Sequence, residues 1–370
     1  MRTDFTAGQT PKRDDAGEVE PGPLMDALPT HPQREQAPWR RTVAKYEAPE
    51  LSRSAWQVVN TVVPYLALWY LMYRSLDVSY WVTVALAVPA AGFASRLFII
   101  FHDCGHGAFF RSKRANTVLG FFTGILTFTP YHSWRHEHAV HHATSGDLDR
   151  RGVGDIWTMT VDEYLNSSFR DRLRYRLYRN PLVLFALGPL YLFLVSQRFP
   201  HRRASKRERR SVHWTNLALV GVIAIMSITI GLKAYIMVQL PILMIVAAAA
   251  VWMFYVQHQH EGAYWERHER WDYLTAALEG SSYYKLPRTL QWFTGNIGFH
   301  HIHHLSPRIP NYFLQKCHDD SELFASVQSI TLFSSAKGLT FRLWDEERHE
   351  LVGFGRLRAS RDRHPPAAPD

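Results

Sequence analysis

Cysteine is scarce in this sequence of 370 residues, which contains only Cys104 and Cys317. Two cysteines cannot build a disulfide framework, and their scarcity fits a reducing compartment. The N-terminal stretch is polar and punctuated by proline and glycine, and it lacks the apolar segment of a secretory signal peptide. We therefore expect residues 1–45 to form a disordered N-terminal tail and residues 341–370 to form a C-terminal tail.

Charge is absent from several long stretches of an otherwise basic chain, whose formal net charge is +9. Each stretch has about the length of a membrane span, and tryptophan and tyrosine stand near several of their ends. A single charge, Arg96, lies near the end of the second stretch, where it could snorkel to the interface. The predicted spans are 56–73, 79–101, 214–232 and 234–256.

The remaining apolar segments are too short to cross a membrane, so we expect 118–128 and 182–195 to lie in the interface. Residues 143–180 are polar and charged, which predicts a soluble cap. With four crossings, both termini, the basic run at 201–210 and the histidine-rich segments fall on one side. Because basic loops mark the cytosolic face, that side is predicted to be the cytosol.

Histidine is abundant and clustered, most clearly in GNIGFHHIHHL at 295–305. On a helix of about 100° per residue, His300, His303 and His304 fall within roughly a 100° arc, so their imidazoles could converge on one point. His301 points about 160° away from His303, which predicts that it faces elsewhere. Asn296, one turn before His300, falls back inside the arc.

The same spacing recurs in WRHEHAVHH, and a shorter element, HDCGH, puts two histidines one helical turn apart. Two further histidines, His258 and His260, follow the last span and lie about 200° apart around a helix, so only one of them can face the metals. The predicted metal ligands are His102, His106, His138, His141, His142, His300, His303 and His304, with His258 as the ninth.

Nine imidazoles are too many for a structural zinc site, which four ligands usually close. All-nitrogen ligation with open positions is typical of redox iron, so the count favours two irons sharing a cavity. A histidine-rich metal transporter is a competing class. Transporters place their polar ligands within the spans, whereas these spans are almost free of ionisable groups.

The three elements HDCGH, WRHEHAVHH and GFHHIHHLSPRIPNY resemble the histidine boxes of the membrane fatty acid desaturases. The resemblance extends through GDLDRRGVGDIWT and WERHERWDYLTAALEGSSYYKLP, and it covers roughly residues 50–320. It is closest to bacterial acyl-lipid enzymes of the omega-6 or delta-12 type. It implies an all-α membrane protein in which residues 46–340 form four transmembrane helices and a cytosolic helical cap that holds the metals.

The resemblance places a Gln-His pair at Gln257-His258, which implies that His258 is the ninth ligand and that His260 packs or supports the ligands. It also implies a cofactor and partners. They are two non-haem irons, molecular oxygen, an acyl-lipid substrate and an external electron donor such as ferredoxin, since no cytochrome b5 pattern is fused to the chain. A bacterial inner membrane is the implied location, and no nucleic acid partner is expected. The same boxes serve hydroxylases of alkanes, sterols or carotenoids, which stay as the alternative; product mass would separate loss of two hydrogens from gain of one oxygen.

Groups beside the ligands are candidates to orient the imidazoles through hydrogen bonds. Asp103 and Glu137 adjoin predicted ligands, and Asn296 could bind weakly or through water. Asp147 and Asp155 are weaker candidates, because charges in a solvated loop are the more ordinary interpretation.

Overall fold

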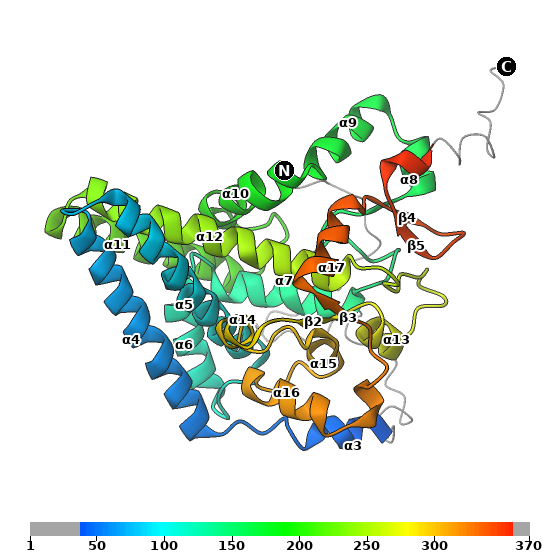
Figure 1. Cartoon of the computed structure of the whole chain (residues 1–370), viewed down its shortest axis with the longest axis horizontal. Coiled ribbons are helices and arrows are strands. Elements are labelled where there is room, and N and C mark those ends of the chain that lie inside the picture. Colours follow the sequence, from blue (N-terminus) through cyan, green and yellow to red (C-terminus); the bar gives the residue numbers. More distant parts are fainter. Residues whose placement is uncertain (1–37, 358–370) are drawn as a thin grey trace.

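The computed structural model describes residues 38–357, and its longest helices form two antiparallel hairpins. α4 (Leu51–Ser75) turns within four residues into α5 (Tyr80–His106), where Ser79 caps the new helix by accepting from the Trp81 amide. α11 (Lys206–Thr229) turns at Gly231 into α12 (Leu232–His258). Because α5 packs against both α4 and α12, the hairpins make one bundle on the left of Figure 1.

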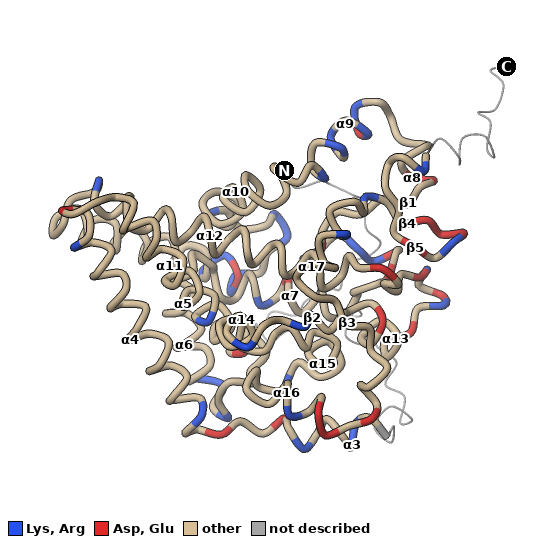
Figure 2. Tube along the Cα trace, viewed as in Figure 1, with Lys and Arg blue, Asp and Glu red and all other residues tan. Residues whose placement is uncertain are grey.

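Three of these helices, α5, α11 and α12, are long and apolar enough to cross a membrane. α4 is equally long, but Gln57 and Asn60 together with its tryptophans and tyrosines lower its mean hydropathy. Its outward side is nevertheless apolar, since Val59, Val63 and Leu66 are all at least half exposed. Figure 2 places most charged residues away from this bundle.

Arg96, the charge inside the second predicted span, does not snorkel. Its side chain is 5% exposed, donates to Thr61 Oγ1 and to the Trp292 carbonyl, and lies 3.7 Å from the Trp292 ring centroid. The segment that contains Trp292, some 200 residues later in the chain, therefore returns to cover this cation, whose burial without partners would be costly. The prediction of a snorkelling side chain is wrong because a distant segment supplies the partners.

The two shorter apolar segments are helical and lie beside the bundle. α6 (Lys113–Leu126) contains most of 118–128 and packs on α5. Residues 182–195 form a π-helical turn at Val183–Leu187 and then α10 (Gly188–Leu194), which packs on α12. The axis bends by 63° between α9 (Phe169–Tyr178) and this segment, so the two form either a broken span or a re-entrant loop.

The remaining described elements form a cap around the C-terminal ends of α5 and α12, which is the inner end of the bundle (Figure 1). The longest is α7 (Tyr131–Thr144), which packs on α5 and α11. The other helices of the cap are α3 (Pro38–Ala44), α8 (Val161–Asn166), α13 (Tyr273–Leu278), α14 (Arg288–Phe293), α15 (His300–Leu305), α16 (Asn311–Asp319) and α17 (Leu332–Ser335).

Small sheets correct the expectation of an all-helical protein. β1 (Met159–Thr160) pairs in parallel with β4 (Leu343–Asp345), which pairs antiparallel with β5 (Glu350–Val352). β2 (Tyr283–Lys285) pairs in parallel with β3 (Ser329–Thr331). These strands are only two or three residues long, too short for a periodic sequence signal.

Both predicted tails overlap regular structure: the N-terminal tail was predicted to end too late and the C-terminal tail to begin too early. α3 occupies part of 1–45, and most of that segment lies outside the described residues. At the other end, Leu343 and Trp344 are at most 1% exposed, because β4 packs them against β1 and neighbouring side chains. The ordered domain therefore extends past residue 340 to at least residue 357.

Candidate metal centre

Nine buried or half-buried histidines from four helices meet at the inner end of the bundle and form two clusters. In each cluster the candidate ligand nitrogens all lie within 4.8 Å of one another. The first cluster contains His102, His106, His138, His142 and His303, and the second contains His141, His258, His300 and His304. These are the nine histidines that the sequence singled out as ligands.

Each HxxHH element serves both clusters, which corrects the expectation that its three imidazoles converge on one point. In α7, His138 and His142 enter the first cluster while His141 enters the second. In α15 the division is reversed, since His303 enters the first cluster while His300 and His304 enter the second. Residues i and i+4 are about 40° apart on a helix and i+3 lies about 60° to the other side, so one helix can face two centres.

Hydrogen bonds fix the ring orientation of His141 and His258 in the second cluster. His141 Nδ1 lies 2.6 Å from Asp155 Oδ1, and His258 Nδ1 lies 3.1 Å from the Gly280 carbonyl oxygen. Both oxygens are acceptors, so each Nδ1 carries a proton and the lone pair with which each ring would bind a metal is at Nε2.

Those two Nε2 atoms are 3.1 Å apart. Two lone pairs at this distance repel each other and cannot form a hydrogen bond. Two nitrogens held at about 2.1 Å from a common ion and at right angles would lie about 3.0 Å apart. The donor set of the second cluster therefore fits a shared cation.

The first cluster is held in a similar way by an aspartate on the ligand helix. His102 Nδ1 lies 3.0 Å from Asp103 Oδ1, and His102 Nε2 lies 3.0 Å from His303 Nε2. Asp103 Oδ2 accepts two bonds of 2.8 Å from Asn311, one from its amide and one from its side chain. Asp103 therefore ties the α5 ligand to α16, which follows the α15 ligands.

Burial keeps the imidazoles of the cap in the form that can bind a metal. The pKa values of His138, His142, His300, His303 and His304 lie well below the ordinary value, first because burial disfavours the charged form and second because neighbouring imidazoles repel a positive charge. Lowered pKa values mean neutral rings at neutral pH. Neutral imidazole is the metal-binding form.

His301 lies outside both clusters, as the helical geometry predicted, and so does His260, as the resemblance implied. His301 is fully buried and its Nε2 lies 3.2 Å from His318 Nδ1, on the side of α15 away from the clusters. His260 Nδ1 donates to the Glu261 carbonyl over 3.0 Å. Both side chains pack within the cap.

Two other polar residues, Asn296 and Glu137, were candidates to support the ligands. Asn296 is not on the helix of His300, because α15 begins at His300 and Asn296 has a positive φ of 58°. Its amide instead donates to the Asn311 carbonyl and accepts from Gln291, so the predicted face-sharing is wrong. Glu137 is half-buried on α7, with its carbonyl oxygen against the loop that carries Asp155.

Asp155, which the sequence suggested only as a weaker candidate, is the hydrogen-bond partner of the predicted ligand His141. Its side chain is 8% exposed and it lies in a loop that would ordinarily be solvated. The local signal is the glycine before it: Gly154 has a φ of +74°, and a Cβ there would lie 2.9 Å from the Glu137 carbonyl oxygen. Only glycine lets this loop approach α7 closely enough for Asp155 to reach His141. Asp147, in the same loop, bonds His268 over 2.8 Å instead.

Comparisons with known proteins agree with this geometry. Residues 78–328 match the family model described as fatty acid desaturase. The chain is 50% identical to a fatty acid desaturase of Bacillus subtilis over 330 residues, which cover 89% of this chain and 94% of that protein. It is 29% identical to the sn-1 acyl-lipid omega-3 desaturase (ferredoxin) of Synechocystis over 60% of this chain and 62% of that protein. An endoplasmic reticulum omega-3 fatty acid desaturase of Vigna radiata is 30% identical over 59% of each chain.

Proposed function

The chain belongs to the fatty acid desaturase family, and we propose that its two histidine clusters hold two irons with which it desaturates lipid acyl chains. The observation that carries the proposal is the meeting of nine imidazoles in two clusters, in each of which Nε2 atoms face one another at 3.0–3.1 Å, as in the pairs His102–His303 and His141–His258. Imidazole nitrogens without thiolates or carboxylates in the clusters fit iron with open positions.

Bound iron supplies oxygen activation, which the removal of hydrogen from an unactivated alkyl chain requires. Molecular oxygen takes four electrons on its way to water. Two come from the C–H bonds of the substrate and two from an external donor. The name of the Synechocystis relative includes ferredoxin, and a ferredoxin-like carrier is the donor that we propose here.

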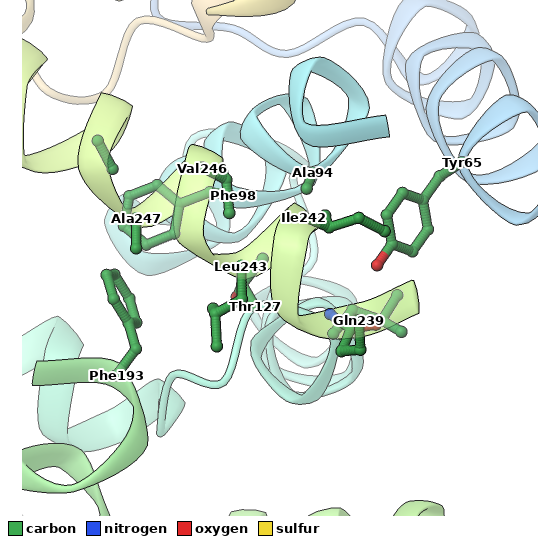
Figure 3. Close-up of a pocket in the computed structure, with 12 residues that line it drawn as sticks. Tyr65, Ala94, Phe98, Thr127, Phe193, Gln239, Ile242, Leu243, Val246 and Ala247 are labelled. Carbon is green, nitrogen blue, oxygen red and sulfur yellow. The ribbon is translucent and has the colours of Figure 1, made fainter. Parts of the chain in front are cut away.

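The protein's own residues must exclude water and position one pair of methylenes beside the clusters. An apolar pocket between α4, α5, α10 and α12 is the proposed place of the acyl chain (Figure 3). Phe98 lines it one turn before His102, so the pocket begins about 6 Å along α5 from the first cluster. Gln239 lines it 19 residues before His258, about 28 Å along α12.

The deep end of this pocket is closed by polar groups from two helices. Tyr65 of α4 and Gln239 of α12 line it there, and Trp69 donates to Gln239 over 3.1 Å. Apart from Thr127, the rest of the lining is alanine, valine, leucine, isoleucine and phenylalanine, as in most sites that enclose an apolar ligand. A lipid tail entering from the bilayer would thus reach the clusters without crossing water.

The orientation of the chain is also a proposal. The ends of α5 and α12 that carry histidines and the starts of α4 and α11 lie at one end of the bundle, next to the basic run 201–210. We infer that α4, α5, α11 and α12 span a bacterial inner membrane with that end in the cytosol.

Expression in a host without polyunsaturated lipids, followed by fatty acid profiling with localisation of double bonds, tests the function. Acids with a new double bond in cells that carry the intact chain, and none with His303→Ala, are expected. Hydroxylated acids in place of olefins would overturn desaturation. Metal analysis of protein kept reduced should find two irons per chain, and one zinc without iron would overturn the cofactor.

A further inference from the structure

The exposed face of α9 is apolar, although the sequence placed this helix in a soluble cap. Phe169, Leu173 and Leu177 are 75%, 47% and 56% exposed. They stand at i, i+4 and i+8, so they form one stripe about 80° wide. A helix on the surface of a soluble domain presents its polar side to solvent. α9 instead exposes an apolar stripe together with its charged side chains.

Arginines border this stripe on both sides. At about 100° per residue, Arg176 lies about 20° before Phe169, while Arg170 and Arg174 lie about 20° and 60° beyond Leu177. All three are exposed. An apolar centre with basic flanks is typical of a helix that lies in a membrane interface, where long side chains carry their charges up to the phosphates.

The opposite side anchors α9 to the cap, which fixes the direction of the stripe. Tyr175 is fully buried, and its hydroxyl accepts from the Met159 amide over 3.1 Å. Arg179, which follows α9 directly, is 1% exposed. It donates to the Tyr255 hydroxyl of α12 and to Gln259, the residue after that helix. The apolar stripe therefore faces outward by construction and cannot turn inward without breaking these bonds.

The stripe continues into a surface that already faces lipid if the bundle spans the membrane. Leu182 and Leu187 are 67% and 58% exposed, and Tyr191 of α10 is 49% exposed. α10 packs directly on the spanning helix α12. α9 itself carries four arginines in ten residues, which excludes it from the hydrocarbon core. A 63° bend separates the axis of α9 from that of the next segment, so the two do not form one straight helix (Figure 1).

We propose that α9 lies in the plane of the cytosolic headgroup layer and binds anionic phospholipids. The apolar stripe enters the acyl boundary, and Arg170 and Arg174 contact phosphates, whereas the Arg176 guanidinium donates to the Tyr164 hydroxyl and lies over the Phe354 ring. Four arginines against one aspartate give this helix a positive charge that an anionic lipid surface complements. In this position the helix keeps the cap at a fixed distance from the membrane, next to the apolar segment 182–195.

Depth-dependent quenching tests the position of α9 in the full chain. Leu173→Cys carries an environment-sensitive fluorophore in nanodiscs, and the native Cys104 and Cys317 are buried and resist labelling. The control is Glu269→Cys, exposed on the cap. Strong quenching by spin-labelled lipid and protection from iodide at 173, with the reverse at 269, are expected.

Access of iodide to position 173 would overturn the proposal. Protection from both quenchers would also overturn it, because a protein segment or a second copy would then cover the stripe. Neither readout requires turnover, so a failure here is distinct from a failure of the proposed chemistry.

The charge requirement has its own test. In nanodiscs of phosphatidylcholine with about one-third phosphatidylglycerol, the intact chain should melt at a higher temperature than in phosphatidylcholine alone. R170Q/R174Q should lose at least half of that difference. R270Q/R348Q, which removes two exposed arginines of the cap, should retain it. Equal loss in both pairs, or none in the first, would overturn the lipid specificity.

Discussion

His258 and His260 stand two residues apart and have different surroundings. His258 belongs to the second cluster and contacts the Nε2 atoms of His141 and His300, whereas His260 bonds a neighbouring carbonyl. His258→Ala should therefore lower the iron content and abolish turnover, and His260→Phe should retain both. Iron per chain and product yield measure the outcome. Loss of iron in the second variant alone would reverse the assignment.

Asp155 acts on the second cluster through His141 and not by ligation. Asp155→Asn keeps the size of the side chain but removes the charge that orients the imidazole. Loss of such a partner typically weakens a metal site by about 10- to 100-fold. We expect faster loss of iron to a chelator and lower turnover. Asp162→Asn, an exposed change on α8, is the matched control, and equal behaviour of the two variants would refute the role of Asp155.

At the scale of the element, α12 connects the second cluster to the proposed acyl pocket. Ala247 is 1% exposed and lines that pocket, while Ala249, two residues on, is exposed on the outside of the same helix. Ala247→Leu should fill the pocket and shift products toward shorter chains or reduce them, with iron content unchanged.

Ala249→Leu is the control for the added volume on this helix. It should leave both the fatty acid profile and the iron content as they are. If Ala247→Leu also leaves the profile unchanged while the protein stays folded, the acyl chain does not occupy this pocket.

The whole molecule has a polarity that labelling can test. Arg203→Cys lies in the basic loop before α11, and Asp77→Cys lies in the turn between α4 and α5 at the opposite end of the bundle. A membrane-impermeant thiol reagent should label the first only after the inner face is opened and the second from outside. Labelling of both from one side would contradict four crossings.

Local periodicity made much of the molecule predictable. Long uncharged runs predicted the helices that became α4, α5, α11 and α12, because a span needs a length and composition that one segment supplies alone. Helical spacing likewise selected eight of the nine clustered histidines and excluded His301, since side chains at i, i+3 and i+4 lie on one side of a helix whatever surrounds them; His258 was added from its place after the last span and from the family resemblance.

Tertiary structure decided what depends on distant partners. The division of each histidine box between two clusters required the positions of four helices, and Asp155 and Gly280 became partners of the ligands only where loops pack against α7 and α12. Arg96 is buried because the chain some 200 residues later covers it. The sequence by itself determined which residues could bind metal and which segments could enter a membrane, because those are properties of single helices. Which atoms meet was left to packing, because a contact requires two surfaces.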